Sequence, residues 1–434
     1  MNYEQAVEYI HSLLRFGVSP GLERIEALCE LLDNPQDKLS FIHVCGTNGK
    51  GTTCSMLSNV LREAGYKTGL FTSPFVVDFC ERMQVNNRFI EHDELAEIVE
   101  QVKAANEKLS ERGIYPTEFE TITAAGLLWF AQTACDIVVL ECGMGGEHDS
   151  TNIIPRPLLA VFTSISLDHT AVLGETVAEI AKEKSGIMKD GCLAVGYPSK
   201  DLGLGFMPQN EDAAKVLERA AEEKGSMLIF ANDTQAKLLG TDITGSDFYA
   251  FGLNLHVPFL GEHQLANTLT AVCALRALQN YGLDITDENI VDGIAQSRMP
   301  ARMEIMSNQP LIILDGGHNA GCAQAVHDAL TKYLPDNSIV ALCALMADKE
   351  CDVTLSKVLP LCRAAVFTAP DNPRASEPQA LKQAGEKYCA ETYAVNSSTA
   401  ALEFAKSLLK DGEVLLIFGS FYLAGEIRGS LLEG

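Results

Sequence analysis

Short apolar runs alternate with amphipathic helical stretches along this chain, and no other feature of the sequence restricts the possible folds as strongly. Apolar runs that predict buried strands occupy residues 41–45, 68–71, 137–140, 159–162, 193–195 and 227–230. Helical periodicity covers residues 51–64, 93–112, 119–133 and 175–187. Parallel strands need long crossover connections, which are usually helices, so the pattern predicts a parallel sheet covered by helices on both faces.

The same alternation restarts near Arg298-Met-Pro300, after a segment of a different kind. Residues 241–260 alternate like a β-hairpin, and two helices are expected near 263–281 and 286–297. Further strands are predicted at 311–314, 339–343, 365–368 and 414–418. We therefore predict an α/β chain with a large parallel-sheet domain over 1–297 and a smaller, Rossmann-like domain over 298–434.

Charge and cysteine content restrict the partners and the compartment. The 434 residues carry a net charge of −25, which repels nucleic acid phosphates and anionic lipid, so neither is an expected partner. The N-terminal stretch is not built like a signal peptide, and no apolar run is long enough for a membrane span. The 13 cysteines are scattered without a C-x-x-C pair, which predicts free thiols in a reducing cytoplasm.

A glycine-rich turn joins the predicted strand 41–45 to the helix that follows. Its sequence is His43-Val-Cys-Gly46-Thr47-Asn48-Gly49-Lys50-Gly51-Thr52-Thr53. Backbone N–H groups in such a turn can surround a polyphosphate, and Lys50 can reach the outer phosphates. The usual P-loop has Gly at 44 and Ser or Thr at 51, so Val44 and Gly51 make this loop a variant. The alternative is an ordinary glycine turn beside a solvated lysine.

The loop resembles that of the Mur ligase superfamily, and more closely its folylpolyglutamate synthase and dihydrofolate synthase branch. Blocks that resemble this branch follow in the same order: Thr72-Ser73-Pro74; Thr117–Glu120; Leu140–Gly146 with Asp149–Asn152; Ser166–Thr170; Glu183–Ile187; Gly261–Asn267; Pro300-Ala-Arg302; Leu314–Asn319; Asp348-Lys349; Pro373-Arg374-Ala375; and Gly419–Tyr422. The resemblance implies an ATP-dependent amide ligase with an N-terminal P-loop ATPase-type domain, the Mur-ligase-type ATP-binding domain, and a C-terminal Rossmann-like ligase domain. The sequence departs from the family at Phe75, where a His is usual, and at Glu147-His148, where Arg-Leu is usual.

Oxygen-donor residues at strand ends are the candidates for binding Mg²⁺. Glu141 ends the predicted strand 137–140, at the edge where sites of parallel sheets open, although it could instead cap a nearby helix or loop. The resemblance implies that Ser73, Glu141 and His169 bind metal, and that Lys184 is carbamylated and provides an anionic oxygen ligand for a second metal ion. Lys50, His169 and Lys184 are the predicted catalytic residues.

The resemblance also implies the remaining nucleotide and substrate contacts. Gly46–Thr52 with Asn267 would bind ATP from the first domain, and Arg302, Asp315 and His318 from the second. Stretches that line the pterin site in the family match Gly21–Arg24; Thr117, Glu118, Phe119 and Glu120; and His148, Asp149 and Ser150. Read alone, Thr117–Glu120 could equally be a helix start with an acidic first turn.

The sequence therefore predicts an ATP- and Mg²⁺-dependent ligase that adds L-glutamate to a folate or dihydropteroate carboxylate through an acyl phosphate, releasing ADP and phosphate. The protein is expected to be a monomer that binds small molecules only. Alternatives are a Mur ligase acting on a UDP-sugar, a regulatory P-loop NTPase, and a structural Rossmann protein. The first would need a further domain before the loop, where only 45 residues stand, and the second a guanine-reading Asn-Lys-x-Asp run, which is missing.

Overall fold

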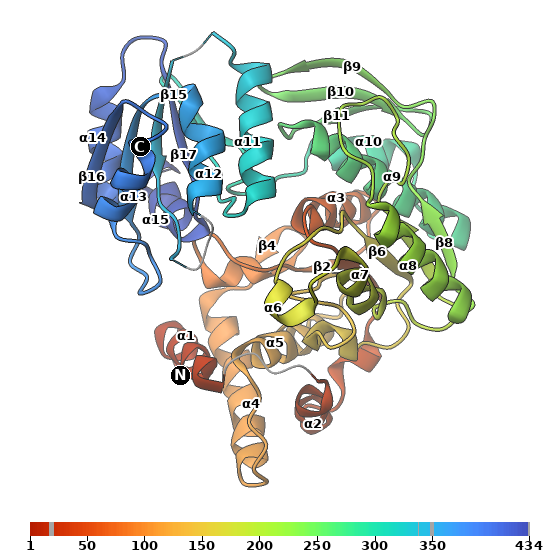
Figure 1. Cartoon of the computed structure of the whole chain (residues 1–434). Coiled ribbons are helices and arrows are strands. Elements are labelled where there is room, and N and C mark those ends of the chain that lie inside the picture. Colours follow the sequence, from red (N-terminus) through yellow and green to blue (C-terminus); the bar gives the residue numbers. More distant parts are fainter. Residues whose placement is uncertain (17–20, 337, 348–350, 433–434) are drawn as a thin grey trace.

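A computed structural model describes residues 1–16, 21–336, 338–347 and 351–432. The predicted block Asp348-Lys349 lies outside these residues. The described part contains two large sheets and one small sheet (Figure 1). The predicted α/β class with two sheet-centred parts is therefore confirmed.

The first sheet has eight strands in the order β4-β3-β2-β5-β1-β6-β7-β8. Their bounds are β1 Phe41–Cys45, β2 Thr68–Phe71, β3 Met83–Val85, β4 Arg88–Phe89, β5 Ile137–Glu141, β6 Leu159–Phe162, β7 Leu193–Gly196 and β8 Met227–Phe230. The six neighbouring strands β2, β5, β1, β6, β7 and β8 are parallel. Strands β3 and β4 add an antiparallel edge beside β2. The parallel strands match the predicted runs, because each is a short apolar segment; all are largely buried except the edge strand β8, whose side chains are partly exposed.

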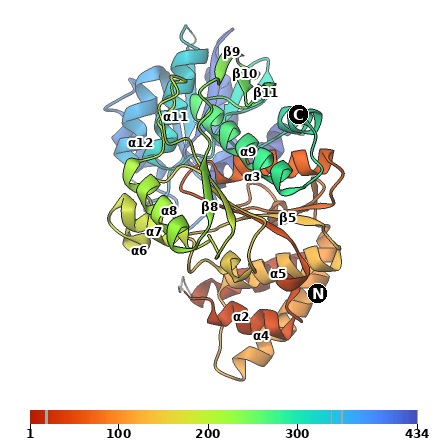
Figure 2. The same cartoon turned by 90° about the vertical axis from the view of Figure 1, so that its right-hand side faces the viewer.

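Helices cover both faces of this sheet (Figure 2). One face packs on α3 Lys50–Glu63, α9 Glu262–Tyr281 and α10 Asp287–Ala295. The other packs on α1 Tyr3–Ser12, α2 Glu23–Leu31, α4 His92–Ser110 and α5 Glu118–Gln132, and further along on α7 Val177–Ser185 and α8 Glu211–Glu223. Shorter helical turns are α6 Thr170–Leu173, η1 Leu13–Phe16, η2 Pro35–Lys38, η3 Phe79–Arg82 and η4 Ser150–Ile153. Neighbouring residues of β1 point to opposite faces, so Phe41 and Ile42 belong to different cores.

A small antiparallel sheet follows, and it corrects the prediction of a hairpin over 241–260. It has three strands, β9 Lys237–Asp242, β10 Gly245–Ala250 and β11 Leu253–Val257. The predicted hairpin is the β10–β11 pair, and β9 was missed because its side chains are mostly exposed and form no apolar run.

The second large sheet has six strands in the order β12-β13-β17-β14-β15-β16. They are β12 Glu304–Asn308, β13 Leu311–Leu314, β14 Ile339–Cys343, β15 Cys362–Ala369, β16 Glu391–Ser397 and β17 Val414–Phe418. All pairs are parallel except β12–β13. One face packs on α11 Ala320–Tyr333, α12 Cys351–Val358, η5 Leu359–Leu361 and α13 Pro378–Gly385, and the other on α14 Ser398–Leu408 and α15 Phe421–Leu432.

Two further sequence-level expectations concern cysteines and membranes. All 13 cysteines are free thiols, as predicted. Across the described residues, no helix combines the length and the apolar character that crossing a bilayer requires.

Candidate active site

The glycine-rich loop, residues 46–49, leaves β1 and passes directly into α3. Gly46 and Gly49 have positive φ angles of 156° and 89°. A β-carbon at Gly46 would lie 1.9 Å from Thr163 Oγ1, and one at Gly49 would lie 2.3 Å from Asn267 Oδ1. Glycine is therefore required at both positions, and the turn ends at the N-terminus of a 14-residue helix, which is an arrangement suited to phosphate.

Two lysine side chains converge on the first carbonyl of this loop. Lys50 Nζ donates to Gly46 O at 3.1 Å and to Thr47 O at 3.2 Å. Lys184 Nζ, from the last turn of α7, donates to the same Gly46 O at 3.0 Å, and Lys184 is 4% exposed. Both side chains are thus held beside the loop, within reach of a ligand bound there.

Glu141 is the last residue of β5, and its carboxylate is buried at the carboxyl edge of the first sheet. Its Oε2 accepts the backbone N–H of Ser73 at 3.1 Å. Burial raises the pKa of the Glu141 carboxyl, while Lys50, Arg302 and Arg82 act in the opposite direction. The Glu141 carboxylate can bind a divalent cation, and the three cations near it can bind an anionic ligand beside that ion.

His169 stands at the start of α6, where its backbone is left-handed with φ 48° and its side chain is about half exposed. The segment before it is attached to the glycine-rich loop through Ser166. Thr47 Oγ1 donates to Ser166 O at 3.1 Å and accepts the Ser166 N–H at 3.1 Å. Ser166, three residues before His169, is therefore fixed to the loop.

A cavity of about 730 Å³ lies between the two large sheets, and we call it the α11 cavity. It is bounded by Ser164–Ser166, by Gly261–His263 at the start of α9, and by one side of α11. Asn267, in the second turn of α9, is 3% exposed and donates from Nδ2 to Gln264 Oε1 at 2.8 Å. The predicted nucleotide residue Asn267 thus lies on α9, the helix whose start borders this cavity, and its side chain lies beside Gly49 of the glycine-rich loop.

The three predicted nucleotide residues of the second part lie near one another. Asp315 directly follows β13, is 6% exposed, and accepts two backbone N–H groups at 2.9 and 2.7 Å. Burial raises the pKa of the Asp315 carboxyl, and Arg302 opposes that effect. The Arg302 guanidinium lies 4.7 Å from the ring centroid of Phe421, and the His318 ring lies 5.8 Å from the same ring.

A second cavity, the α5 cavity, measures about 570 Å³ and collects most of the predicted substrate residues. The predicted residues that line it are Thr117, Phe119, His148, Asp149 and Ser150. Asp149 is buried, and its Oδ2 accepts the N–H of Met144 at 2.7 Å. His148 Nδ1 lies 3.1 Å from Glu183 Oε2, so the family departure at His148 is paired with the residue before Lys184.

The other two predicted substrate residues, Glu118 and Glu120, make contacts elsewhere. Glu118 Oε1 lies 2.8 Å from His11 Nδ1. Glu120 is 2% exposed and forms an ion pair with Arg24 at 2.9 Å. Neither borders the α5 cavity in the part of the chain that the structure describes. Both carboxylates instead attach the start of α5 to the N-terminal helices.

A third cavity of about 420 Å³, the interdomain cavity, shares Pro74 and Arg82 with the α5 cavity. Residues that reach it from the second sheet and its helices are His318, Met346, Arg374, Ser420, Phe421, Tyr422, Gly425 and Glu426. Neither Arg82 nor Glu183 was predicted to have a role. Glu183 stands beside Lys184 in the Glu183–Ile187 motif, whereas nothing in the local sequence distinguishes Arg82 from a surface arginine.

Models of two families match the chain. The Mur ligase middle domain matches residues 44–275, and the glutamate ligase domain of Mur ligases matches residues 301–421. Among curated proteins, the folylpolyglutamate synthase of Lacticaseibacillus casei is 35% identical over 443 residues, covering 100% of both chains. The dihydrofolate synthase/folylpolyglutamate synthase of Bacillus subtilis is 32% identical over 438 residues, covering 99% of each.

Solved structures agree with these matches. Mycobacterium tuberculosis folylpolyglutamate synthase, in complex with ADP and AMPPCP, superposes with a TM-score of 0.86 at 26% identity. The match covers 99% of this chain and 99% of that one. The fold is thus shared over nearly the whole length of both chains.

Proposed function

The chain belongs to the folylpolyglutamate and dihydrofolate synthase family of Mur ligases, and is an ATP-dependent enzyme that joins glutamate to a folate-type acid; from that premise we propose how its own residues divide the work. The observation that carries the proposal is the position of the glycine-rich loop. Lys50, Lys184 and the buried Glu141 lie beside it. Residues 164–166 border the α11 cavity, and residues 148–150 border the α5 cavity.

The nucleotide is assigned to the loop and the α11 cavity. Backbone N–H groups of residues 46–52 and the Lys50 amine would bind the phosphates, and Asn267 would orient the nucleoside. Arg302, Asp315 and His318 would complete the site from residues 298–434. Their support is proximity to one another and to Phe421, and the effect of Arg302 on the Glu141 carboxyl.

Mg²⁺ fits the donors beside the loop, because it prefers oxygen ligands and keeps several waters. Glu141 is the primary candidate, with the Ser73 hydroxyl second, since the Ser73 backbone already bonds the Glu141 carboxylate. His169 and a carbamylated Lys184 are the candidates for a second ion. Bound Mg²⁺ would neutralise phosphate charge, and these residues would hold it against the loop.

The pterin end of the acid is assigned to the α5 cavity, where Phe119 offers an aromatic wall and Thr117, His148, Asp149 and Ser150 offer polar groups. The incoming L-glutamate is assigned to the interdomain cavity. Arg82, Arg374 and His318 supply cationic groups there that suit its carboxylates. Because Arg82 borders both cavities, the acid and the amine would meet beside it.

The proposed reaction has two steps. A carboxylate oxygen of the acid attacks the γ-phosphorus of ATP, forming an acyl phosphate and releasing ADP. The glutamate nitrogen then attacks the acyl carbon, loses a proton, and displaces phosphate to leave an amide. Lys50 would offset charge on the transferred phosphoryl group, and closure of residues 298–434 over 1–297 would exclude water from the acyl phosphate.

We also propose that the chain acts as a monomer and that it works in the cytoplasm. Its 13 free thiols support the cytoplasmic location, because thiols persist in a reducing compartment.

Whether dihydropteroate, a glutamylated folate, or both are accepted is decided by an ADP-release assay. Purified protein is given ATP, Mg²⁺ and L-glutamate, with dihydropteroate in one arm and tetrahydrofolate in the other. ADP formation that needs both the acid and glutamate supports the proposal. Release of AMP and pyrophosphate would contradict the acyl phosphate, and ADP formation without glutamate would favour an NTPase.

A further inference from the structure

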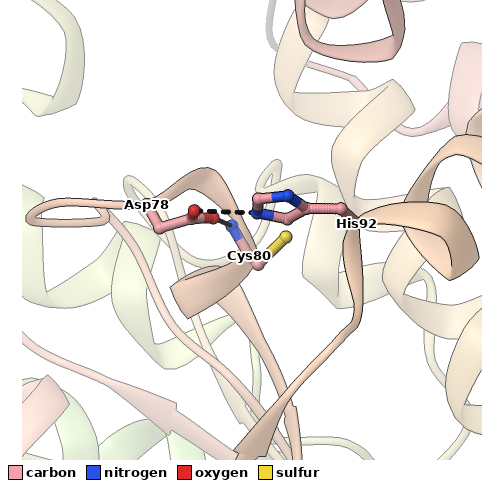
Figure 3. A group of neighbouring side chains, drawn as sticks. All are labelled: Asp78, Cys80 and His92. Atoms are coloured by element: carbon pink, nitrogen blue, oxygen red, sulfur yellow. Dashed lines mark hydrogen bonds and ion pairs between the residues drawn. The ribbon is translucent and has the colours of Figure 1, made fainter. Parts of the chain in front are cut away.

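A cluster of three metal-binding side chains lies outside the active site described above. Asp78 precedes η3, Cys80 lies within it, and His92 begins α4 (Figure 3). One ligand atom from each lies within 4.8 Å of the other two, and Asp78 Oδ2 is 3.0 Å from His92 Nε2. Figure 3 shows the thiol, the imidazole and the carboxylate turned toward one another.

We propose that Asp78, Cys80 and His92 form a Zn²⁺ site. One thiolate, one imidazole and one carboxylate are ligands that Zn²⁺ accepts, whereas Mg²⁺ prefers oxygen alone. Tetrahedral Zn²⁺ with bonds of about 2.0–2.3 Å separates its ligand atoms by roughly 3.3–3.8 Å. The ligand atoms of the cluster lie within 4.8 Å of one another, against that spacing. His92 is about half exposed, which leaves room for water as the fourth ligand.

The surroundings of the cluster already orient these ligands. Tyr3 OH donates to Asp78 Oδ1 at 3.1 Å, and the Cys80 N–H donates to the same oxygen at 2.7 Å, so Oδ2 is directed to His92. The Tyr3 ring stacks on the His92 imidazole with centroids 3.8 Å apart. Outer partners of this kind hold metal ligands in position. Glu81 and Glu91 add negative charge near the thiol, which a divalent cation would offset.

Zinc here would fix the segment that borders two substrate cavities. Residues 73–77 and Arg82 line the α5 and interdomain cavities, and η3 carries the chain from Asp78 to Arg82. Glu81 accepts the N–H groups of Val76, Val77 and Asp78 at 2.7–3.1 Å, and these bonds hold the segment together as one unit. A metal bound to His92 would attach that unit to α4, and through Tyr3 to α1.

Protein freed of metal by a chelator is titrated with Zn²⁺ in excess Mg²⁺ by calorimetry, and Co²⁺ is added separately to look for thiolate-to-cobalt absorption. We expect one Zn²⁺ per chain with micromolar affinity or tighter, a higher melting temperature on binding, and the cobalt band. Cys80→Ser and His92→Gln should lose this binding. Tyr3→Phe should weaken it by about tenfold, as for other outer partners.

Three control variants isolate the cluster. His256→Gln removes a His–Asp pair of the same 3.0 Å separation that has no thiol. Cys273→Ser alters a thiol that is 5% exposed, close to the 3% of Cys80, but lies in a helix interior. His148→Gln disrupts the other candidate cluster, Glu147, His148 and Glu183, which lies beside Lys184 and belongs to the active site. All three should bind Zn²⁺ at the Cys80 site as the parent protein does.

Loss of zinc from the cluster should raise KM for the folate-type acid and for glutamate more than KM for ATP. That consequence rests on the proposed function, whereas zinc binding and the cobalt band do not, so the two can fail separately. The site is rejected if the parent protein binds no Zn²⁺ in this range, or if both Cys80→Ser and His92→Gln retain it. If Cys80→Ser does not fold, His92→Gln decides alone, because its side chain is half exposed.

Discussion

At the scale of single residues, Lys50 is the most direct test of the phosphate loop. Lys50→Ala removes the amine that bonds Gly46 O and Thr47 O, and with it a cation that we assign to the transferred phosphoryl group. We expect turnover to fall by about 100-fold or more in the ADP-release assay, with the melting temperature little changed. Lys215→Ala, which breaks an exposed pair with Glu211, is the control and should keep full activity. Near-normal turnover of Lys50→Ala would mean that Lys50 and its loop do not bind the transferred phosphoryl group.

Lys184 carries the second prediction, that it works as a carbamate. A positively charged lysine amine would repel Mg²⁺, whereas a carbamate supplies anionic oxygens. Lys184→Ala should therefore lose activity by weakening Mg²⁺ binding, and acetate or formate should partly restore it. Lys182→Ala, two residues earlier on the exposed side of α7, should change neither. An unmodified amine in crystals grown with carbon dioxide and Mg²⁺, together with an active Lys184→Ala protein, would reject the carbamate.

The buried His43 side chain should make the folded protein less stable in acid. The side chain is fully buried beside Thr151 and Cys142, and burial, with a smaller effect of Lys189, lowers its pKa to about 3. The unfolded chain, with an ordinary pKa of about 6.5, then binds the proton more tightly, so stability falls as the pH drops below 6.5 toward 3. Each unit in that window costs about 1.4 kcal/mol.

Urea unfolding at pH 7.5 and pH 4.5 measures this effect. Between these values we expect His43→Gln to lose about 3 kcal/mol less stability than the parent protein, because the interval covers two pH units below 6.5. His263, whose pKa burial lowers to about 4, remains in both proteins and contributes equally to both. If the parent and the variant lose stability equally over this interval, His43 is protonated in the folded protein.

At the scale of elements, the join between the loop and α3 can be tested with a matched pair of glycines. Gly49 and Gly65 lie at opposite ends of α3 and share a φ of 89°. A β-carbon at Gly49 meets Asn267 Oδ1 at 2.3 Å, whereas, apart from its chain neighbours, none of the described residues lies within 4 Å of one at Gly65. Both alanine variants should lose about 1–2 kcal/mol through backbone strain. Only Gly49→Ala should also lose ATP affinity, by about tenfold or more, because Asn267 must move. Equal ATP affinities would mean that Asn267 does not position the nucleotide.

Which elements could be predicted depended on how each strand is buried. The central strands, such as β5 and β17, are buried on both faces and read as continuous apolar runs. The missed strands β3, β4, β9, β12 and β16 have partly exposed side chains and lie at or next to sheet edges. Their pairing depends on neighbours that are remote in sequence, so local periodicity does not reveal them.

The candidate site divides in the same way. Residues in contiguous motifs, such as the loop around Lys50 or Glu141 at a strand end, could be proposed from the sequence. Arg82 could not, because its importance comes from lying where two cavities meet. Conversely, Glu118 and Glu120 alternate with Phe119 in one motif, yet the helical turn directs them to His11 and Arg24. A motif places residues along the chain, and the turn of a helix decides which of them reach a cavity.

At the scale of the whole molecule, the hydrophobic cores divide almost completely near residue 297. The clusters on the first sheet take only Met299 from the second part, as a partly buried neighbour. The clusters on the second sheet take Val76 and Leu260 from the first, with Ile243 as a partly buried neighbour. Polar contacts across the division include Lys332 with Glu262 at 3.0 Å and Thr241 with Tyr333 at 3.1 Å. Exposed contacts of this kind contribute little, so each part should retain most of its stability alone.

A chain ending at Gln296 tests both this division and the shared nucleotide site. It keeps the first sheet, the helices on both of its faces and the glycine-rich loop. We therefore expect it to unfold cooperatively, at a melting temperature close to that of the same part within the full protein. Val76 and Leu260 become exposed, which should reduce solubility without unfolding the sheet. Because Arg302, Asp315 and His318 are absent, the shortened chain should bind ATP more weakly and form no detectable amide. Substantial ligation by this chain would contradict a nucleotide site shared between the two parts. A chain that failed to fold would contradict the separation of the cores.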